Sequence, residues 1–357
     1  MKILITGVCG FAGSHLAIAL AERIENARIA GIDNLLRPGS ELNRAILRKV
    51  GVRFVHGDLR LRSDVDGLPD CDWVIDAAAN PSVLAGIDGR SSSRQIGEHN
   101  LGGTINVLEY CRERNAGLIL LSSSRVYSIA DLSALPVTVR AGAYALDIKA
   151  PLPAGVSCAG VNESFSTAPP VSLYGATKLC SEVLALEYGA AFGFPVWVNR
   201  CGNLAGAGQF GTAEQGIFSY WIHAHERRAR LRYIGFGGHG HQVRDALHPA
   251  DLAELIARQM QRSSAPIESA IYNAGGGASN AMSLAQLTAW CDDRFGAHTP
   301  ESDLQPRPFD IPWMVMNPKR AADEFGWTPE RPLTAILQEI AVHAELNPRW
   351  AELCEAS

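Results

Sequence analysis

The fold of this chain is decided by its first stretch, Lys2-Ile3-Leu4-Ile5-Thr6-Gly7-Val8-Cys9-Gly10-Phe11-Ala12-Gly13. A short apolar run, typical of a buried strand, leads into glycines at three-residue spacing, and a helical pattern follows from Ala12 to about Arg23. Glycines in such a turn let a pyrophosphate approach the backbone amides at the start of the helix. The same spacing also occurs in purely structural turns, so the rest of the chain must decide whether this turn binds a dinucleotide.

Short apolar or β-branched runs alternate with longer helical patterns through residues 1–200. The run 118–121 is apolar at every position, as strands of a parallel sheet buried on both faces are. We therefore expect an α/β fold with a Rossmann-type, doubly wound parallel sheet. The expected strands are 2–6, 28–32, 53–56, 73–76, 118–122 and 196–199.

The alternation fades after residue 200, where glycine-rich turns such as 235–238 indicate a smaller, mixed α/β substrate lobe. We expect an NAD-binding domain over 1–200, with a return segment near 240–275, and a mainly substrate-binding lobe over 201–357. The segment from Ser128 to Pro170 is rich in Ala, Pro, Gly and Ser, which predicts a long, partly irregular insertion that serves a site.

Composition excludes several classes of protein. The chain has 357 residues, 47% of them hydrophobic, and a net charge of -5, so it offers no broad positive field for nucleic acid or an anionic membrane. Its eight cysteines form no C-x-x-C pair, which predicts reduced thiols in a cytoplasmic protein and no zinc site. No stretch reaches the roughly 20 apolar residues that a membrane span needs.

A carboxylate at the end of the second expected strand supports a dinucleotide site. Asp33 lies about 20 residues after Gly13, where a carboxylate accepts hydrogen bonds from the adenosine ribose and repels a 2′-phosphate. This position favours NAD over NADP. Arg37 is the one nearby residue that favours NADP instead.

A tyrosine and a lysine four residues apart suggest proton chemistry. Tyr174 and Lys178 share one helix face, and an ammonium beside a positively charged nicotinamide favours the phenolate, which can take a proton from a substrate hydroxyl. Such pairs alone are more often surface contacts. The serines at 122–124, however, end an apolar strand at the sheet edge where open α/β folds bind ligands, and one of their hydroxyls is expected to orient the substrate.

Together these features resemble the extended short-chain dehydrogenase/reductase family and, within it, the nucleotide-sugar epimerases. The resemblance covers nearly the whole chain. It rests on Gly7-x-x-Gly10-x-x-Gly13, Asp33-Asn34, Gly57-Asp58-Leu59, Ala77-Ala78-Ala79, Asn100-x-Gly102-Gly103-Thr104, Ser123 before Val126-Tyr127, Tyr174-x-x-x-Lys178, Arg200-x-x-Asn203 and Phe325-Gly326-Trp327. It implies an NAD-dependent enzyme that inverts one carbon of a nucleotide-diphosphate sugar through a transient keto sugar.

The resemblance also implies which residues act. Ser123, Tyr174 and Lys178 would be catalytic, with Lys178 holding the nicotinamide ribose and lowering the pKa of Tyr174. The implied cofactor contacts, from the pyrophosphate turn to the adenine and the riboses, are Gly7, Gly10, Phe11, Ala12, Gly13, Asp33, Asn34, Asp58, Leu59, Ala77, Ala78, Ala79, Asn100, Tyr174 and Lys178.

The resemblance places the substrate against Asn203, Arg244 and Arg307. Both arginines match family arginines that grip the substrate diphosphate, a task that suits a forked guanidinium. The arginines at 227, 228, 230 and 232 favour a solvated face instead. Paired histidines at 223/225 and 239/241 have no acidic or thiol partner nearby, so no metal site is expected.

The sequence leaves the particular reaction open. The segments 208–216 and 242–245 look most like the branch of 2-epimerases that act on CDP-linked sugars. Gly208 and Cys201 depart from that branch, and inversion at C2 or C4 requires the same catalytic set. Family dehydratases carry Asp-Glu where Ser124-Arg125 stand, which argues against elimination. A net dehydrogenase stays possible, a non-catalytic NAD-binding protein is disfavoured, and a homodimer is expected.

Overall fold

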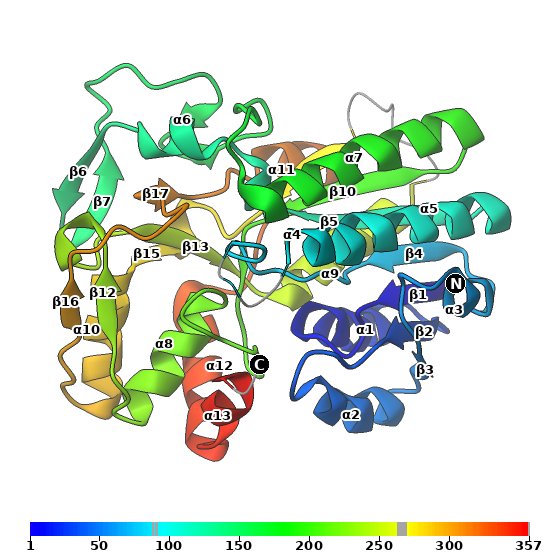
Figure 1. Cartoon of the computed structure of the whole chain (residues 1–357), viewed down its shortest axis with the longest axis horizontal. Coiled ribbons are helices and arrows are strands. Elements are labelled where there is room, and N and C mark those ends of the chain that lie inside the picture. Colours follow the sequence, from blue (N-terminus) through cyan, green and yellow to red (C-terminus); the bar gives the residue numbers. More distant parts are fainter. Residues whose placement is uncertain (88, 90–91, 263–269, 356–357) are drawn as a thin grey trace.

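The computed structural model describes residues 1–87, 89, 92–262 and 270–355, and its centre is a seven-stranded sheet (Figure 1). The strand order is β14-β10-β5-β4-β1-β2-β3, and all neighbours are parallel. The chain winds outward in both directions from β1 and β4, which confirms the doubly wound Rossmann-type sheet. The strands are β1 (Lys2–Thr6), β2 (Arg28–Asp33), β3 (Arg53–His56), β4 (Trp73–Asp76), β5 (Gly117–Ser123), β10 (Val196–Cys201) and β14 (Ile271–Ala274).

Helices cover both faces of this sheet. Ile3 and Ile5 of β1 pack into the core beneath one set of helices, and Leu4 points into the core beneath the other, as the two-residue period of a strand requires. The first set comprises α1 (Phe11–Arg23), α2 (Asn43–Lys49), α9 (Pro249–Met260) and α11 (Lys319–Phe325). The second comprises α3 (Arg62–Asp66), α5 (Gly103–Arg114) and α7 (Ser172–Phe192).

All six expected strands are present. β2, β5 and β10 run one or two residues beyond their expected ends, because pairing with neighbouring strands, which the side-chain pattern does not report, sets where a strand ends. The seventh strand, β14, comes from the segment after α9 that was expected to return to the sheet.

A smaller mixed sheet stands beyond the carboxyl edge of the large one (Figure 1). β13 pairs in parallel with β11 and β17 and antiparallel with β15. Helices α8, α10 and α12 share one core beside it, so the expected mixed α/β region is confirmed. The elements are β11 (Asn203–Leu204), α8 (Ile217–Glu226), β12 (Arg232–Ile234), β13 (Val243–Leu247), β15 (Ala281–Ser283), α10 (Leu284–Phe295), β16 (Glu301–Asp303), β17 (Trp313–Met314), α12 (Leu333–Leu346) and α13 (Trp350–Glu355).

The segment 128–170 is more regular than its sequence indicated. It forms α6 (Ile129–Ser133), the hairpin of β6 (Val137–Arg140) and β7 (Ala143–Leu146), and the short hairpin of β8 (Val156–Ser157) and β9 (Gly160–Val161). Its apolar residues share a core with 311–316, far along the chain. Strands of two to four residues are too short to show a period, so this order could not be read from the pattern.

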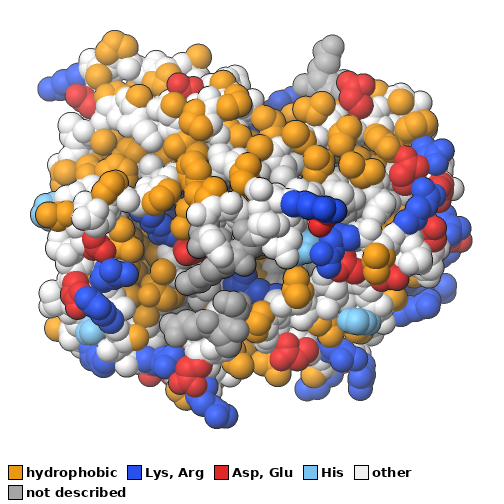
Figure 2. Space-filling view, in the orientation of Figure 1, with side chains coloured by type: hydrophobic (Ala, Val, Ile, Leu, Met, Phe, Trp, Pro, Cys, Tyr) orange, Lys and Arg blue, Asp and Glu red, His pale blue; other side chains and the backbone are white. Residues whose placement is uncertain are grey.

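In Figure 2 Lys and Arg side chains are interspersed with Asp and Glu along the edges of the visible face. Within the part of the chain that the structure describes, no helix combines the length and apolar character required to cross a membrane.

Candidate functional site

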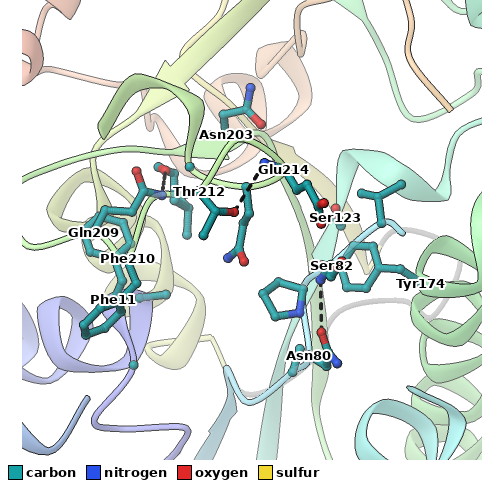
Figure 3. Close-up of a pocket in the computed structure, with 18 of the residues that line it drawn as sticks. Phe11, Asn80, Ser82, Ser123, Tyr174, Asn203, Gln209, Phe210, Thr212 and Glu214 are labelled. Atoms are coloured by element: carbon teal, nitrogen blue, oxygen red, sulfur yellow. Dashed lines mark hydrogen bonds between the residues drawn. The ribbon is translucent and has the colours of Figure 1, made fainter. Parts of the chain in front are cut away.

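One cavity of about 1100 Å³ lies at the carboxyl edge of the large sheet, between the sheet and the smaller lobe. Every predicted site residue except Asn100 lines it. Figure 3 shows Ser123 and Tyr174 together on one side of this cavity, and Phe11, Gln209 and Phe210 on the other. The structure therefore brings the predicted cofactor, catalytic and substrate residues to a single cavity.

The glycine turn is too tightly packed for a side chain at Gly7 or Gly13. Gly7 has a φ of 62°, and its carbonyl accepts a hydrogen bond from the Gly10 N–H at 3.0 Å. A Cβ at Gly13 would lie 2.2 Å from the Gly7 carbonyl oxygen, well inside van der Waals contact. α1 begins directly after Gly10, with no side chain capping it. The turn thus leaves the helix N-terminus open towards the cavity, as a pyrophosphate requires.

Asp33 is the last residue of β2, and Arg37 lies on the loop that follows this strand. One Asp33 oxygen accepts the Cys9 N–H at 2.9 Å, which ties the carboxylate to the glycine turn, and burial raises its pKa. Arg37 donates to the Phe210 carbonyl at 2.6 Å and to the Gln215 side chain at 3.2 Å. The guanidinium of Arg37 is therefore bound to the segment 209–216 through two of its donors.

Asp58 and Leu59, at the predicted adenine end, lie on the loop after β3. Asp58 forms an ion pair with Arg60 at 2.6 Å and accepts the Asn34 amide at 3.1 Å. The Arg60 guanidinium holds the pKa of the Asp58 carboxyl well below its usual range. The carboxylate is therefore ionised and held in place where it faces the cavity.

The loop after β4 is fixed from below by buried polar groups. Thr6 donates its hydroxyl to Asp76 at 2.6 Å and accepts the N–H groups of Ala77 and Ala78 at 3.0 Å each. Thr104 donates to the other Asp76 oxygen at 3.0 Å. These hydrogen bonds position the backbone of residues 77–79 along the cavity wall.

Asn100 lies behind this loop, away from the cavity lining. It is 2% exposed, accepts the Asn80 N–H at 2.7 Å and donates to Thr177 of α7 at 3.2 Å. It belongs to a π-helical turn, 97–102, between α4 (Ser93–Ile96) and α5. Its geometry fits a residue that holds the loop, and its predicted contact with the ribose stays a prediction.

The proton-transfer group is assembled from β5 and α7. Tyr174 is 8% exposed; burial raises the pKa of its phenol, while a hydrogen bond with Ser123 and the charge of Arg125 lower it. Lys178 donates from Nζ to the Leu121 carbonyl at 2.9 Å and is 3% exposed, and burial lowers its pKa. The phenol, hydroxyl and ammonium therefore converge at the end of β5, on one wall of the cavity.

A buried ion pair supports this wall from behind. Arg200 of β10 binds Glu182 of α7 at 2.7 Å, and Glu182 also accepts the Ser122 hydroxyl. The Arg200 guanidinium lies 5.1 Å from the centre of the Tyr127 ring. Ser122 is thus occupied structurally, which leaves Ser123 as the serine beside Tyr174.

The substrate side carries an excess of positive charge. Arg244 of β13 binds Asp310 at 2.9 Å, and burial lowers its pKa. Arg307 lines the same cavity on the loop that leads to Asp310. Asn203 lies at the start of β11. Two guanidiniums with one carboxylate make a site suited to a dianion such as a diphosphate.

Arg125 is a cavity residue to which sequence reasoning assigned no role. It donates to the Phe309 carbonyl at 3.2 Å, and burial, followed by the charge of Arg244, lowers its pKa to about 10. Phe309 has a φ of 58°, an uncommon value for a bulky residue. The sequence indicates only that Ser124-Arg125 lacks carboxylates, whereas the structure places the charge of Arg125 near Tyr174.

The remaining polar clusters have structural partners. Arg230 pairs with Glu301 and Arg232 with Asp303 on the exposed rim of the cavity, consistent with a solvated face. His225 pairs with Asp292. Among the residues that the structure describes, no group of three or more His, Cys, Asp or Glu could hold a metal ion. None of the eight cysteines, all of which lie within the described residues, forms a disulfide.

A doubly wound nucleotide-binding sheet with a serine, a tyrosine and a lysine at its carboxyl edge defines an enzyme of the short-chain dehydrogenase/reductase class. Residues 3–275 match the family described as the NAD dependent epimerase/dehydratase family, and the chain belongs to that family. The predicted family and its NAD cofactor are thereby confirmed.

Three similar proteins match this chain over nearly its full length. A CDP-paratose 2-epimerase from Salmonella typhi is 29% identical over 344 residues, covering 92% of this chain and 95% of that protein. The structure of a UDP-glucose 4-epimerase with UDP-glucose from Thermotoga maritima has a TM-score of 0.77 at 20% identity, covering 97% of this chain and 99% of that one. A UDP-glucuronic acid 4-epimerase from Bacillus cereus, in complex with UDP-glucuronic acid and NAD, has a TM-score of 0.76 at 22% identity, with the same coverage. At these identities the two structures support the fold.

Proposed function

We propose that this chain is a nucleotide-sugar epimerase that inverts one sugar carbon through a transient keto sugar. One observation carries the proposal: a single cavity joins the open glycine turn, the Ser123–Tyr174–Lys178 group and the cationic substrate side. A cofactor and a sugar held in this cavity would meet at the hydroxyl of Tyr174.

The cofactor end fits NAD. The turn 7–13, whose three glycines carry no side chain, would accept the pyrophosphate, Asp33 the adenosine ribose, and Asp58 the adenine edge. Asn34, Leu59 and the loop 77–79 would line the rest of the cofactor's path. NAD, when bound, supplies the acceptor and donor of the hydride and a positively charged nicotinamide ring.

The proton chemistry falls to this chain's own side chains. Tyr174 takes the proton from the sugar hydroxyl at the carbon to be oxidised, and Ser123 holds that oxygen by a hydrogen bond. Arg125 favours the phenolate because its positive charge lowers the pKa of Tyr174, and the ammonium of Lys178, on the same helix, would add to this effect. When the ketone has turned its other face to the cofactor, Tyr174 returns the proton as the sugar is reduced.

The substrate end fits a diphosphate linked to a sugar. Arg244, oriented by Asp310, and Arg307 would grip the two phosphates, and Asn203 would contact the sugar side. The relative at 29% identity acts, by its name, on CDP-paratose at C2. This favours a CDP-linked sugar inverted at C2, with a 4-epimerase as the alternative. A homodimer stays part of the proposal.

Elimination of water is the competing reaction in a family named for epimerases and dehydratases. It would require an acid and a base beside the catalytic hydroxyls. Ser124 and Arg125 occupy the two positions after Ser123, and Asp310, a carboxylate that lines the cavity, is paired with Arg244. The site therefore favours returning the hydride to the same carbon over removing water.

A substrate panel tests the proposal. The purified protein is incubated without added NAD with CDP-, UDP-, GDP- and dTDP-linked sugars, and NMR follows each sugar for an inverted centre, with Tyr174→Phe as the matched inactive control. We expect inversion with one nucleotide class and none with the variant. No inversion with any donor, together with stoichiometric reduction of added NAD, would identify a net dehydrogenase instead.

A further inference from the structure

A short segment, 209–216, crosses the cavity as its roof. Its tip is closed by two backbone hydrogen bonds between Thr212 and Gln215, at 2.7 and 3.1 Å, and Glu214 donates its N–H to the Thr212 hydroxyl. All of these residues line the cavity. In Figure 3 Thr212 and Glu214 lie between the Phe11–Phe210 side and the Ser123–Tyr174 side. The roof therefore spans the region between the cofactor turn and the catalytic group.

One residue of the large sheet domain anchors this roof. Arg37, on the loop after β2, donates to the Phe210 carbonyl at 2.6 Å and to the Gln215 side chain at 3.2 Å, so it holds both the base and the tip of the segment. Its guanidinium also lies 5.8 Å from the centre of the Phe210 ring. Arg37 is in the same loop as the residues beside the predicted adenosine ribose, so the anchor is at the cofactor end.

The C-terminal helix clamps the roof from the other side. The Trp350 ring of α13 stacks on Phe210 with centroids 5.2 Å apart, and its indole N–H donates to the Gln209 carbonyl at 2.9 Å. Phe11 of the glycine turn packs against the same cluster. Phe210 and Cys354 of this cluster are almost completely buried. The roof is thus fastened to both lobes directly above the first turn of α1.

We propose that Arg37 is a positioning residue that keeps the roof closed over NAD, so that the cofactor is retained from one turnover to the next. This inference deepens the proposed function, because an enzyme that returns the hydride to its substrate gains nothing by releasing NAD. Loss of the two Arg37 hydrogen bonds frees the tip of the roof while the Phe210–Trp350 stack still holds its base. NAD then leaves through the opened tip.

The rate of NAD release tests this directly. Holoprotein loaded with radiolabelled NAD is chased with unlabelled NAD at a temperature well below its thermal transition. Arg37→Met, which keeps the aliphatic stem but removes the donors, should release NAD at least tenfold faster than wild type. Gln215→Ala, which removes only the anchor at the tip, should show a smaller increase. Arg48→Met, at an exposed arginine on α2, should release NAD at the wild-type rate.

The outcomes separate this inference from the proposed function, because the chase contains no sugar. Release rates within twofold of wild type for both Arg37→Met and Gln215→Ala would overturn it, as would a wild-type protein that loses its NAD within seconds. Equal acceleration in Arg48→Met would show a general loss of stability and would also overturn it. If Arg37→Met does not fold, the release rate of Gln215→Ala alone decides. If it folds, the double variant of Arg37→Met and Gln215→Ala should release NAD no faster than Arg37→Met.

Discussion

The two ends of the cavity are built in different ways. At the cofactor end, the predicted pyrophosphate position is made of backbone from one contiguous stretch, 7–13, whose glycines leave amides and space. The substrate end is made of side chains from four separate segments, represented by Arg125, Asn203, Arg244 and Arg307. Adding a single methyl group to one of these glycines should therefore disturb the cofactor end. The substrate end depends on charges that distant partners hold in place. Substitutions there should weaken substrate binding and leave the cofactor bound.

The largest effect is expected where the two ends meet. Tyr174→Phe removes the hydroxyl that accepts the proton but keeps the buried ring, so kcat should fall by about 10²–10⁴-fold. NAD content and the affinity for the nucleotide sugar should stay near those of wild type. Steady-state rates with NAD quantified in the same samples check this. A variant with half the wild-type kcat would remove Tyr174 from the mechanism.

A change at the cofactor end should weaken NAD binding. In Gly13→Ala the new Cβ would lie 2.2 Å from the Gly7 carbonyl oxygen, and the turn must shift to admit it. Overpacking of this kind costs ~1–3 kcal/mol, equivalent to a loss of up to about 100-fold in NAD affinity. Calorimetric titration with NAD measures it, and Gly97→Ala, where a Cβ meets nothing, is the control. Equal NAD affinity in Gly13→Ala and wild type would be incompatible with the turn as the pyrophosphate site.

A change at the substrate end should leave NAD in place. Arg244→Ala removes a charged contact worth ~1.5–3 kcal/mol, so KM for the sugar nucleotide should rise by about 10–100-fold with NAD retention unchanged. Asp310→Asn keeps the arginine but loosens its orientation, and its effect should be smaller. If Arg244→Ala releases NAD instead, the assignment of the two ends is wrong.

The smallest effect concerns acid stability of the smaller lobe. Burial, and then the nearby His343, lower the pKa of His223 to about 4. Because the folded pKa lies below the unfolded value of about 6.5, this histidine contributes stability above pH 6.5 that is lost as the pH falls towards 4. At pH 5 the loss should be about 2 kcal/mol, and His223→Leu should lose less between pH 7 and pH 5. Denaturant titrations at both pH values compare the two proteins; parallel losses would exclude His223 as the cause.

The same contrast explains what the sequence could predict. The turn 7–13, the strands and the Tyr174–Lys178 pair follow from local spacing, because a glycine turn and a helical i, i+4 pair require only near neighbours. The partners of Arg37 and Arg125 lie 173 and 184 residues further along the chain. A local sequence pattern cannot predict hydrogen bonds between residues so far apart in the chain.

One residue and one segment show what local sequence does not predict. The motif predicts Asn100 near the cofactor ribose, and it does not report the hydrogen bonds that the Asn100 side-chain amide makes with Asn80 and Thr177 from a π-helical turn. The hairpins of 128–170 were not expected, since their stability comes from packing on residues 311–316. In both cases tertiary contacts decided what the local sequence left open.

The central claim is that one bound NAD takes a hydride from a sugar carbon and returns it to the same carbon. The most direct test runs the reaction in D₂O with the nucleotide sugar that the panel identifies, and examines the inverted carbon of the product by NMR. The account predicts an inverted product that carries no deuterium at that carbon. Deuterium at the inverted carbon, or release of NADH in proportion to the sugar consumed, would contradict it.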